Sequence, residues 1–212
     1  MRVNLEARAA SAEQRRLRTR ERLLDAAERI VADKGVEQAS IEEFVVAAGV
    51  SRGTFYNYFP TATDLLNALN LRVAAHLDDA LDRLSPAGRS PAALLALSLH
   101  MVLAAYLDDP VRGWVALQLA HSRAPRVRSF EARFAALYVE GVRQGQFREI
   151  AVSAAWTVAF GSMRMVQRDV VAGAATPVEA AQVIALVLAA FGLPYDEAER
   201  VSRDEAVAAR RI

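Results

Sequence analysis

The chain has 212 residues, a net charge of +1 and no cysteine. Its length allows one large or two small domains, and its high apolar content with scarce Gly and Pro suits an all-α protein. The lack of cysteine excludes disulfides, thiol redox chemistry, thiolate zinc sites and cysteine nucleophiles. Met1 to Arg20 contains no apolar core, and the apolar stretch Ala92–Leu107 is shorter than the roughly 20 residues of a membrane span. We therefore expect a cytoplasmic protein without membrane contact.

The first segment is basic although the whole chain is nearly neutral. Between Arg2 and Arg22 there are seven arginines and three glutamates. Such a run is usually a solvated face, but before a DNA-binding motif it favours contacts to phosphates, here by Arg15 and Arg18. The apolar spacing that follows predicts a helix over about Ala12–Asp33, which Lys34-Gly35 ends.

Two short helices joined by a glycine turn are predicted next. Ser40 is placed to cap the first, Ala48-Gly49-Val50 interrupts the period, and Ser51 is placed to cap the second through Phe59. This arrangement is a helix-turn-helix, whose second helix enters the major groove of DNA. An ordinary helical hairpin is the alternative.

The second short helix has an apolar side and a polar side. Phe55 and Phe59 lie four residues apart on one face, so the polar residues face elsewhere. Arg52 can bind guanine O6 and N7, and the Thr54 methyl can contact a thymine methyl. The free amides at Ser51 favour a phosphate. The DNA-contacting residues that we predict here are Ser40, Ser51, Arg52, Thr54, Tyr56, Asn57 and Tyr58.

About the first third of the chain resembles the N-terminal DNA-binding domain of the TetR family of bacterial transcriptional regulators. The matching residues are Ala26-Ala27, Gly35, Ala48-Gly49-Val50-Ser51, Gly53-Thr54-Phe55-Tyr56, Tyr58-Phe59 and Leu65. The resemblance implies that Tyr56 and Tyr58 donate hydrogen bonds to phosphates, while Asn57 contacts a base or the backbone. Packing of Tyr56 against the fourth helix is the alternative.

Two departures from the family pattern stand out. Ala62 occupies a position where the family usually has a phosphate-binding Lys, which should weaken binding and its salt dependence rather than sequence choice. Phe44-Val45 replaces the usual Ile-Ala, and the larger side chains could change the tilt of the recognition helix.

Residues 12–62 are thus predicted to form the helix-turn-helix domain, and residues 63–212 a helical ligand-binding and dimerisation domain. Thr61 to Asp64 reads as a capping box for a long fourth helix, and Ser85–Gly88 is the first clear break after it. Further helices are expected to begin at Pro91, after Asp109-Pro110, at Pro125, near Ser153, at Val178 and near Asp196. No strand alternation or internal repeat is visible.

The resemblance implies a ligand pocket within the second domain. Large or polar side chains of its helices are candidates for the lining: His100, Met101, Tyr106, Trp114, Gln118, Phe134, Tyr138, Trp156, Phe160 and Arg164. At helical spacing such residues usually form plain core, and Arg164 could instead pair with a carboxylate or face solvent. A mainly apolar lining predicts a small hydrophobic effector.

The sequence offers no enzyme signature and no cofactor. The three histidines, His76, His100 and His121, show no metal-ligand spacing, and neither a phosphate-binding glycine loop nor a nucleophile motif is present.

The resemblance further implies a homodimer through the eighth and ninth helices, with candidate contacts Ala159, Gly161, Ala181, Ile184 and Leu188. The expected function is a ligand-responsive regulator of double-stranded operator DNA, most simply a repressor. A helical small-molecule or partner-binding protein with a degenerate helix-turn-helix is the alternative.

Overall fold

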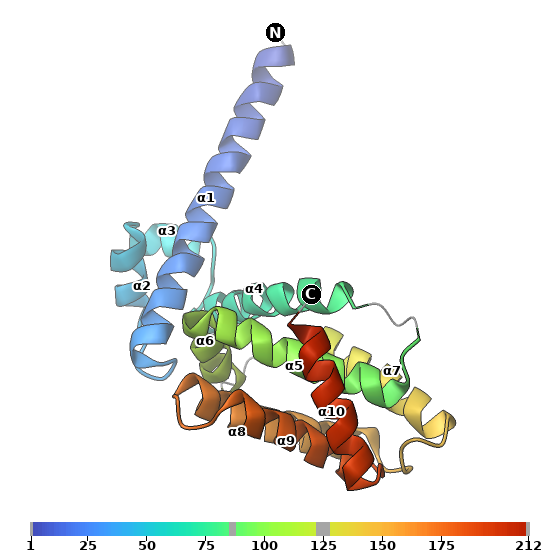
Figure 1. The fold of residues 1–212 in the computed structure, drawn as a ribbon. Coiled ribbons are helices and arrows are strands. Elements are labelled where there is room, and N and C mark those ends of the chain that lie inside the picture. The colour runs from blue at the N-terminus through green and yellow to red at the C-terminus, as the bar shows by residue number, and fades with distance from the viewer. Residues whose placement is uncertain (1, 85–87, 122–127, 211–212) are drawn as a thin grey trace. The chain divides into compact units, whose positions relative to one another are not determined.

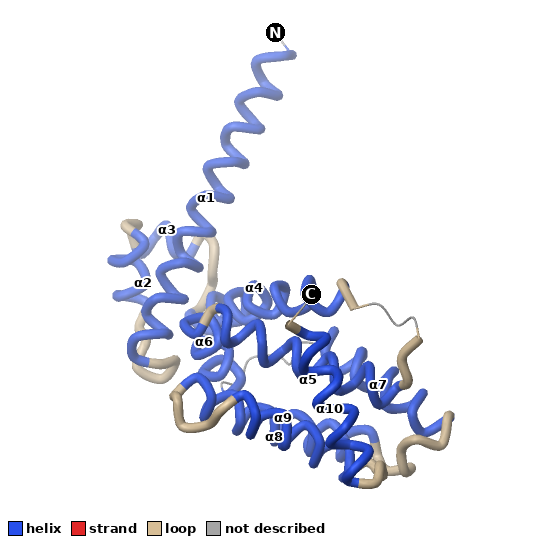
Figure 2. The backbone as a smooth tube through the Cα atoms, in the orientation of Figure 1, coloured by secondary structure: helices blue, strands red, loops and turns tan. Residues whose placement is uncertain are grey.

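The computed structural model describes residues 2–84, 88–121 and 128–210. Over these residues the chain consists of helices and loops, as Figure 2 shows, in agreement with the all-α prediction. The chain divides into two compact units, Met1–Arg72 with Gln118–Pro125, and Val73–Leu117 with Arg126–Ile212.

The N-terminal unit contains α1 (Arg2–Lys34), α2 (Ile41–Ala48), α3 (Arg52–Tyr56) and the start of α4 (Ala62–Asp82). Figure 1 shows α2 and α3 beside the C-terminal half of α1, whose N-terminal half projects away from them. α1 begins ten residues before the predicted start, because its Ala- and Arg-rich first segment contains no helix breaker. α3 ends at Tyr56, three residues early, and a turn completes the segment to Phe59.

The helix-turn-helix is held by its caps and by a glycine. The Ser40 and Glu43 side chains form a complete capping box at the start of α2. Gly49 ends α2 with a φ of 61°, a left-handed conformation that a side chain disfavours. A Cβ at Gly49 would also lie 2.9 Å from Nη2 of Arg22. The turn therefore requires glycine on two counts.

The C-terminal unit holds the rest of α4, then α5 (Pro91–Asp108), most of α6 (Pro110–His121), α7 (Arg128–Arg143), α8 (Val152–Val171), α9 (Pro177–Ala190) and α10 (Tyr195–Ala209). The predicted start of α7 at Pro125 lies outside the described residues. α8 and α9 run side by side, and α10 packs on α5 and α9 (Figure 1). α5 is long and apolar enough to cross a membrane by composition, but 56% of it is buried, as in a core helix.

Aromatic rings fill the centre of this unit. Phe134 stacks on Tyr138, and both rings contact Phe191 edge to face. The Tyr138 hydroxyl donates to the carbonyl of Arg148 at 2.7 Å, which satisfies its only donor in the core. This cluster packs α7 against the C-terminal end of α9.

Candidate nucleic-acid interface and effector cavity

α3 is anchored by two buried phenylalanines and leaves its polar residues accessible. Phe55 is completely buried and Phe59 is 4% exposed, so these rings hold the helix against the domain. Their aromatic contact has a centroid separation of 6.1 Å. The predicted division of α3 into an apolar and a polar face is therefore present.

The predicted contact residues share the outer face of α3 and the turn after it. Tyr56 is 45% exposed, and its ring touches Phe55 edge to face. Arg52 and Asn57 are exposed, whereas Thr54 and Tyr58 are half-buried. The side chain of Tyr56 is thus available to a partner.

The two serines work as helix caps. Ser51 Oγ accepts from the amide of Thr54 at 3.1 Å and lies 2.9 Å from the Thr54 hydroxyl. Ser40 Oγ donates to Glu43 at 2.7 Å. Both residues remain exposed at helix N-termini, and the Ser40 amide donates to the Glu43 carboxylate at 3.1 Å as part of the capping box.

Sequence reasoning missed a partner for Arg52. Nη1 of Arg52 lies 3.3 Å from a carboxylate oxygen of Glu42 on α2. The pKa of Arg52 is raised, first by a hydrogen bond with Tyr56 and then by the charges of Tyr56 and Glu42. The exposed guanidinium of Arg52 therefore has an ion-pair partner on α2. The ten-residue separation of Arg52 and Glu42 gives no periodic signal of this pairing.

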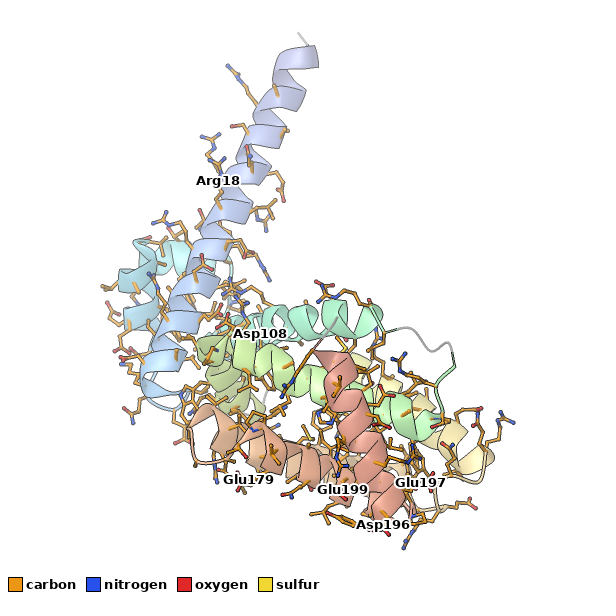
Figure 3. The ribbon with its side chains drawn as sticks, viewed as in Figure 1. Arg18, Asp108, Glu179, Asp196, Glu197 and Glu199 are labelled. Atoms are coloured by element: carbon orange, nitrogen blue, oxygen red, sulfur yellow. The ribbon has the colours of Figure 1, made fainter. Side chains whose placement is uncertain are left out.

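The basic run on α1 divides into two groups. Arg22 donates to the carbonyls of Ala48 and Gly49, and the Arg20 guanidinium lies 5.6 Å from the Phe59 ring centroid. These two arginines, which were not among the predicted phosphate contacts, stabilise the motif. Arg15 and Arg18 are exposed, and Figure 3 shows Arg18 on the projecting part of α1.

A second group of charges braces α1 against α4. Arg72 binds Asp25 at 2.7 Å and Glu21 at 3.4 Å, and it also pairs with Glu28. Burial acts to lower the pKa of Arg72, but the carboxylates together outweigh it, so the pKa is raised. At the start of α4, the Thr61 hydroxyl accepts from the amide of Asp64 at 3.1 Å, so the predicted capping box is present. Ala62 opens that helix half-buried.

A cavity of about 300 Å³ lies within the C-terminal unit, between α4, α5, α7 and α8. Its walls are apolar except for Ser98 and Arg133. The lining residues are Leu81, Leu84, Leu94, Leu95, Ser98, Leu99, Val102, Phe130, Arg133, Phe134, Ala136, Leu137 and Phe160. The predicted residues Phe134 and Phe160 are therefore brought together, and Trp156 stacks on Phe160 with a centroid separation of 3.7 Å.

Other predicted pocket residues lie elsewhere. Tyr138 belongs to the aromatic core, Met101 packs with Leu81 and Leu97, and half-buried Trp114 is not part of the lining. Gln118 belongs to the N-terminal unit, where its Oε1 would lie 3.3 Å from a Cβ on Gly35. Met101 and Tyr138 are therefore core residues, and α6, which carries Trp114 and Gln118, contributes no residue to the lining of this cavity.

His100 is likewise a structural residue. Its Nε2 lies 3.1 Å from the Ser202 hydroxyl, which donates onward to the carbonyl of Ala181 at 2.7 Å. Burial is the main cause that lowers the pKa of His100 to about 4. The imidazole is therefore neutral at pH 7 and connects α5, α9 and α10. The side chains of His76 and His121 lie outside the described set.

Tyr106 and Arg164 form a separate polar pair. Burial raises the pKa of Tyr106 to about 12, and the Arg164 charge opposes this rise. Burial lowers the pKa of Arg164, whose Nη2 reaches the carbonyl of Leu117 at 3.5 Å. No carboxylate of the described part of the chain pairs with Arg164. Of the alternatives for Arg164, pairing with a carboxylate is therefore not seen among these residues.

Three predicted dimer contacts are buried within the chain itself. Ala159, Ile184 and Leu188 have no exposed surface, because they pack in the core of the C-terminal unit. They are therefore corrected to core residues. Gly161 is exposed and Ala181 is half-buried. Large apolar side chains that sequence reasoning missed, Met165 and Leu186, are 54% and 56% exposed on α8 and α9.

Residues 23–69 match the family model for bacterial regulatory proteins of the tetR family. A HTH-type transcriptional repressor, LfrR of Mycolicibacterium smegmatis, is 41% identical over 71 residues, which cover 34% of this chain and 36% of that protein. An uncharacterized HTH-type transcriptional regulator of Bacillus subtilis, YvdT, is 38% identical over 59 residues, covering 28% and 30%. The chain thus spans about a third of the length of these curated relatives.

Solved structures match over most of the chain. RolR in complex with resorcinol has a TM-score of 0.67 at 26% identity, covering 90% of this chain and 95% of that one. A gamma-butyrolactone receptor, described as ArpA-like, has a TM-score of 0.62 at 19% identity, covering 93% and 98%, which shows a shared fold. These matches cover both units, so the solved structures share the fold of each.

Proposed function

Because this chain belongs to the TetR family of bacterial regulatory proteins, we propose that it is a cytoplasmic transcriptional regulator that binds operator DNA. The observation that carries this proposal is α3 with the turn after it, in which Phe55 and Phe59 are buried while Arg52 and Tyr56 are exposed. A short helix fixed in this way behind a capped turn has the form that enters a major groove. Catalysis is not part of the proposal.

The contacts divide by chemistry into base and phosphate contacts. Arg52 and Thr54 stand at the N-terminus of α3 and are assigned to base edges, where they would give sequence preference. Tyr56, Asn57 and Tyr58, with the amides at Ser51, are assigned to the backbone, which positions the helix. Arg52 must leave Glu42 to reach a base. Since exposed ion pairs contribute little to stability, this exchange costs little free energy.

The regulator is proposed to act as a homodimer through α8 and α9. A groove between these helices is lined mainly by apolar residues such as Met165, Val183 and Leu186, with Asp169 and Glu179 also in its lining. A Cβ added at Gly161 would meet no atom within 4 Å, which leaves room for a close helix. A two-fold dimer would place two copies of α3 on half-sites about one or more helical turns, roughly 34 Å each, apart.

The effector is proposed to be a small hydrophobic molecule bound in the cavity of the C-terminal unit. The leucine and phenylalanine walls would gain from burying apolar surface, while Ser98 and Arg133 would orient a polar group. The RolR neighbour is described with resorcinol, which supports a small aromatic effector. As a repressor, the protein would release DNA because the effector binds the DNA-incompetent state more tightly.

The test uses a labelled duplex from the DNA flanking the gene. We expect salt-sensitive binding of the full chain to a pseudo-palindrome and release by a hydrophobic effector that changes Trp156 fluorescence. Arg52→Ala should relax base choice, with Glu37→Gln as a surface control. If no flanking duplex binds while a hydrophobic ligand does, the helical carrier with a degenerate motif is the better description. A sugar or a metal ion that releases DNA would contradict the effector class.

A further inference from the structure

The N-terminal half of α1 packs against nothing in the described part of the chain. Residues 7–18 are all exposed, whereas buried residues begin at Leu23. An isolated helix of this length is marginal in water, so its surface gains stability from a partner. Figure 1 shows this segment projecting from the helix-turn-helix.

Arginines on this segment lack acidic partners. Arg8, Arg15, Arg16 and Arg18 form no ion pair with any described carboxylate, and Arg15 Nε donates only to the carbonyl of Ser11 at 3.2 Å. In contrast, Arg20 lies 3.5 Å from Glu21. The projecting segment therefore carries uncompensated positive charge.

Most of this charge lies on one stripe of the helix. At about 100° per residue, Arg8, Arg15 and Arg18 fall within an arc of about 80° that also contains Arg22 and Arg29. Arg29 donates to the carbonyl of Ala47 at 3.3 Å, and Arg22 to that of Ala48. The stripe therefore continues along the side of α1 that faces the helix-turn-helix.

Glu13, the acidic residue among residues 7–18, and Arg16 lie outside this stripe. Glu13 is turned by about 160° from Arg15, and Arg16 by about 100°. Leu17 is the one large apolar side chain among residues 7–18, so the segment lacks the broad apolar face by which helices enter lipid. The pattern fits a linear array of negative charges rather than a membrane surface.

We infer that residues 8–18 of α1 form a helical arm that binds the phosphates of the duplex flanking the half-site read by α3. The inference rests on the proposed DNA-binding function and extends it. Arg8 lies about 21 Å from Arg22 along the helix, the length of about six base pairs. Arginine suits this role because its guanidinium binds phosphate oxygens in pairs and stays charged.

The experiment compares neighbouring arginines on different faces. The full chain is titrated with an operator duplex that carries six to eight flanking base pairs, and with a duplex trimmed to the half-sites. Arg15→Ala should lower the slope of log K against log salt by up to about 0.9 on the flanked duplex, and Arg16→Ala should lower it less. The triple variant R8A/R15A/R18A should abolish the preference for the flanked duplex.

A double variant tests whether the arm must be helical, without changing its charge. Replacing the exposed Ala9 and Ala10 with glycine keeps every charge but disfavours the helix. A9G/A10G should weaken binding to the flanked duplex several-fold and leave binding to the trimmed duplex unchanged. Circular dichroism of each variant confirms that the rest of the chain is folded.

Contrary outcomes separate the arm from the proposed function. Equal losses from Arg15→Ala and Arg16→Ala, or an unchanged slope in the triple variant, would overturn the arm while operator binding stands. Binding of the arginine stripe to phosphatidylglycerol vesicles, with no flank preference, would also overturn it. A wild-type chain that binds no duplex would remove the proposed function and the arm together.

Discussion

The guanidinium of Arg22 on α1 donates to the carbonyl of Ala48 at the end of α2, with a distance of 2.5 Å between Nη2 and the oxygen. The last carbonyls of a helix have no partner within it, so this contact satisfies one of them with a charged donor. It also holds the turn that directs α3.

Arg22→Gln should destabilise the N-terminal unit by about 1.5–3 kcal/mol, since hydrogen bonds to charged groups contribute about that much. Chemical denaturation followed by circular dichroism measures the loss. Arg16→Gln, which removes an arginine with no described partner, should leave stability unchanged. Equal stability of the two variants would contradict a role of Arg22 in the turn.

Glu42→Gln should raise operator affinity several-fold. The change frees Arg52 from its ion pair and removes a negative charge close to the phosphates. Fluorescence anisotropy with labelled operator DNA at two salt concentrations measures the affinity. Glu37→Gln is the matched control on an exposed residue before α2. If both substitutions strengthen binding alike, the gain reflects net charge and not release of Arg52.

Leu186→Glu should convert the proposed dimer to monomers without unfolding the chain. Leu186 is 56% exposed in the chain, so a glutamate is tolerated there but would be buried unpaired in a dimer. Sedimentation at micromolar protein concentration measures the oligomeric state. Val139→Glu on α7, at a similarly exposed valine, should leave the assembly intact. A wild-type monomer at this concentration would exclude the dimer.

Val102→Trp should block the effector and preserve operator binding. Val102 lines the cavity, and the larger ring would fill part of its volume of about 300 Å³. Overpacking costs about 1–3 kcal/mol, which a folded domain tolerates. The ligand concentration that releases half of the DNA should rise at least tenfold. Val111→Trp, at an exposed residue of α6, supplies the control. Unchanged release by the cavity variant would place the effector elsewhere.

The C-terminal unit should lose stability as the pH falls from about 6.5 to about 4. The pKa of His100 is lowered to about 4 in the folded chain, so over this range the unfolded chain binds more protons. The difference from the ordinary value of 6.5 corresponds to about 3 kcal/mol. Urea denaturation at pH 7 and pH 4.5 measures this loss of stability. In His100→Gln this pH dependence should flatten, and an unchanged profile would assign it to other groups.

Local sequence determined most of the helix boundaries in both units. Ser40, Ser51 and Thr61 are helix caps, and Gly49 ends α2, as their positions before or after apolar runs predicted. Capping and glycine conformation depend on neighbours within about four residues, so a single sequence carries this information. The division of α3 into buried Phe55 and exposed Tyr56 follows for the same reason.

Tertiary structure decided which side chains face one another across helices. Sequence placed Ile184 at a dimer surface and His100 in a pocket, yet both are buried within the core. It gave no indication that Arg22 would bind Ala48 or that Arg133 would line a cavity with Phe160. Helical periodicity defines the apolar face of each helix, but the rotation of that face toward a core, a cavity or a second chain depends on how distant helices pack.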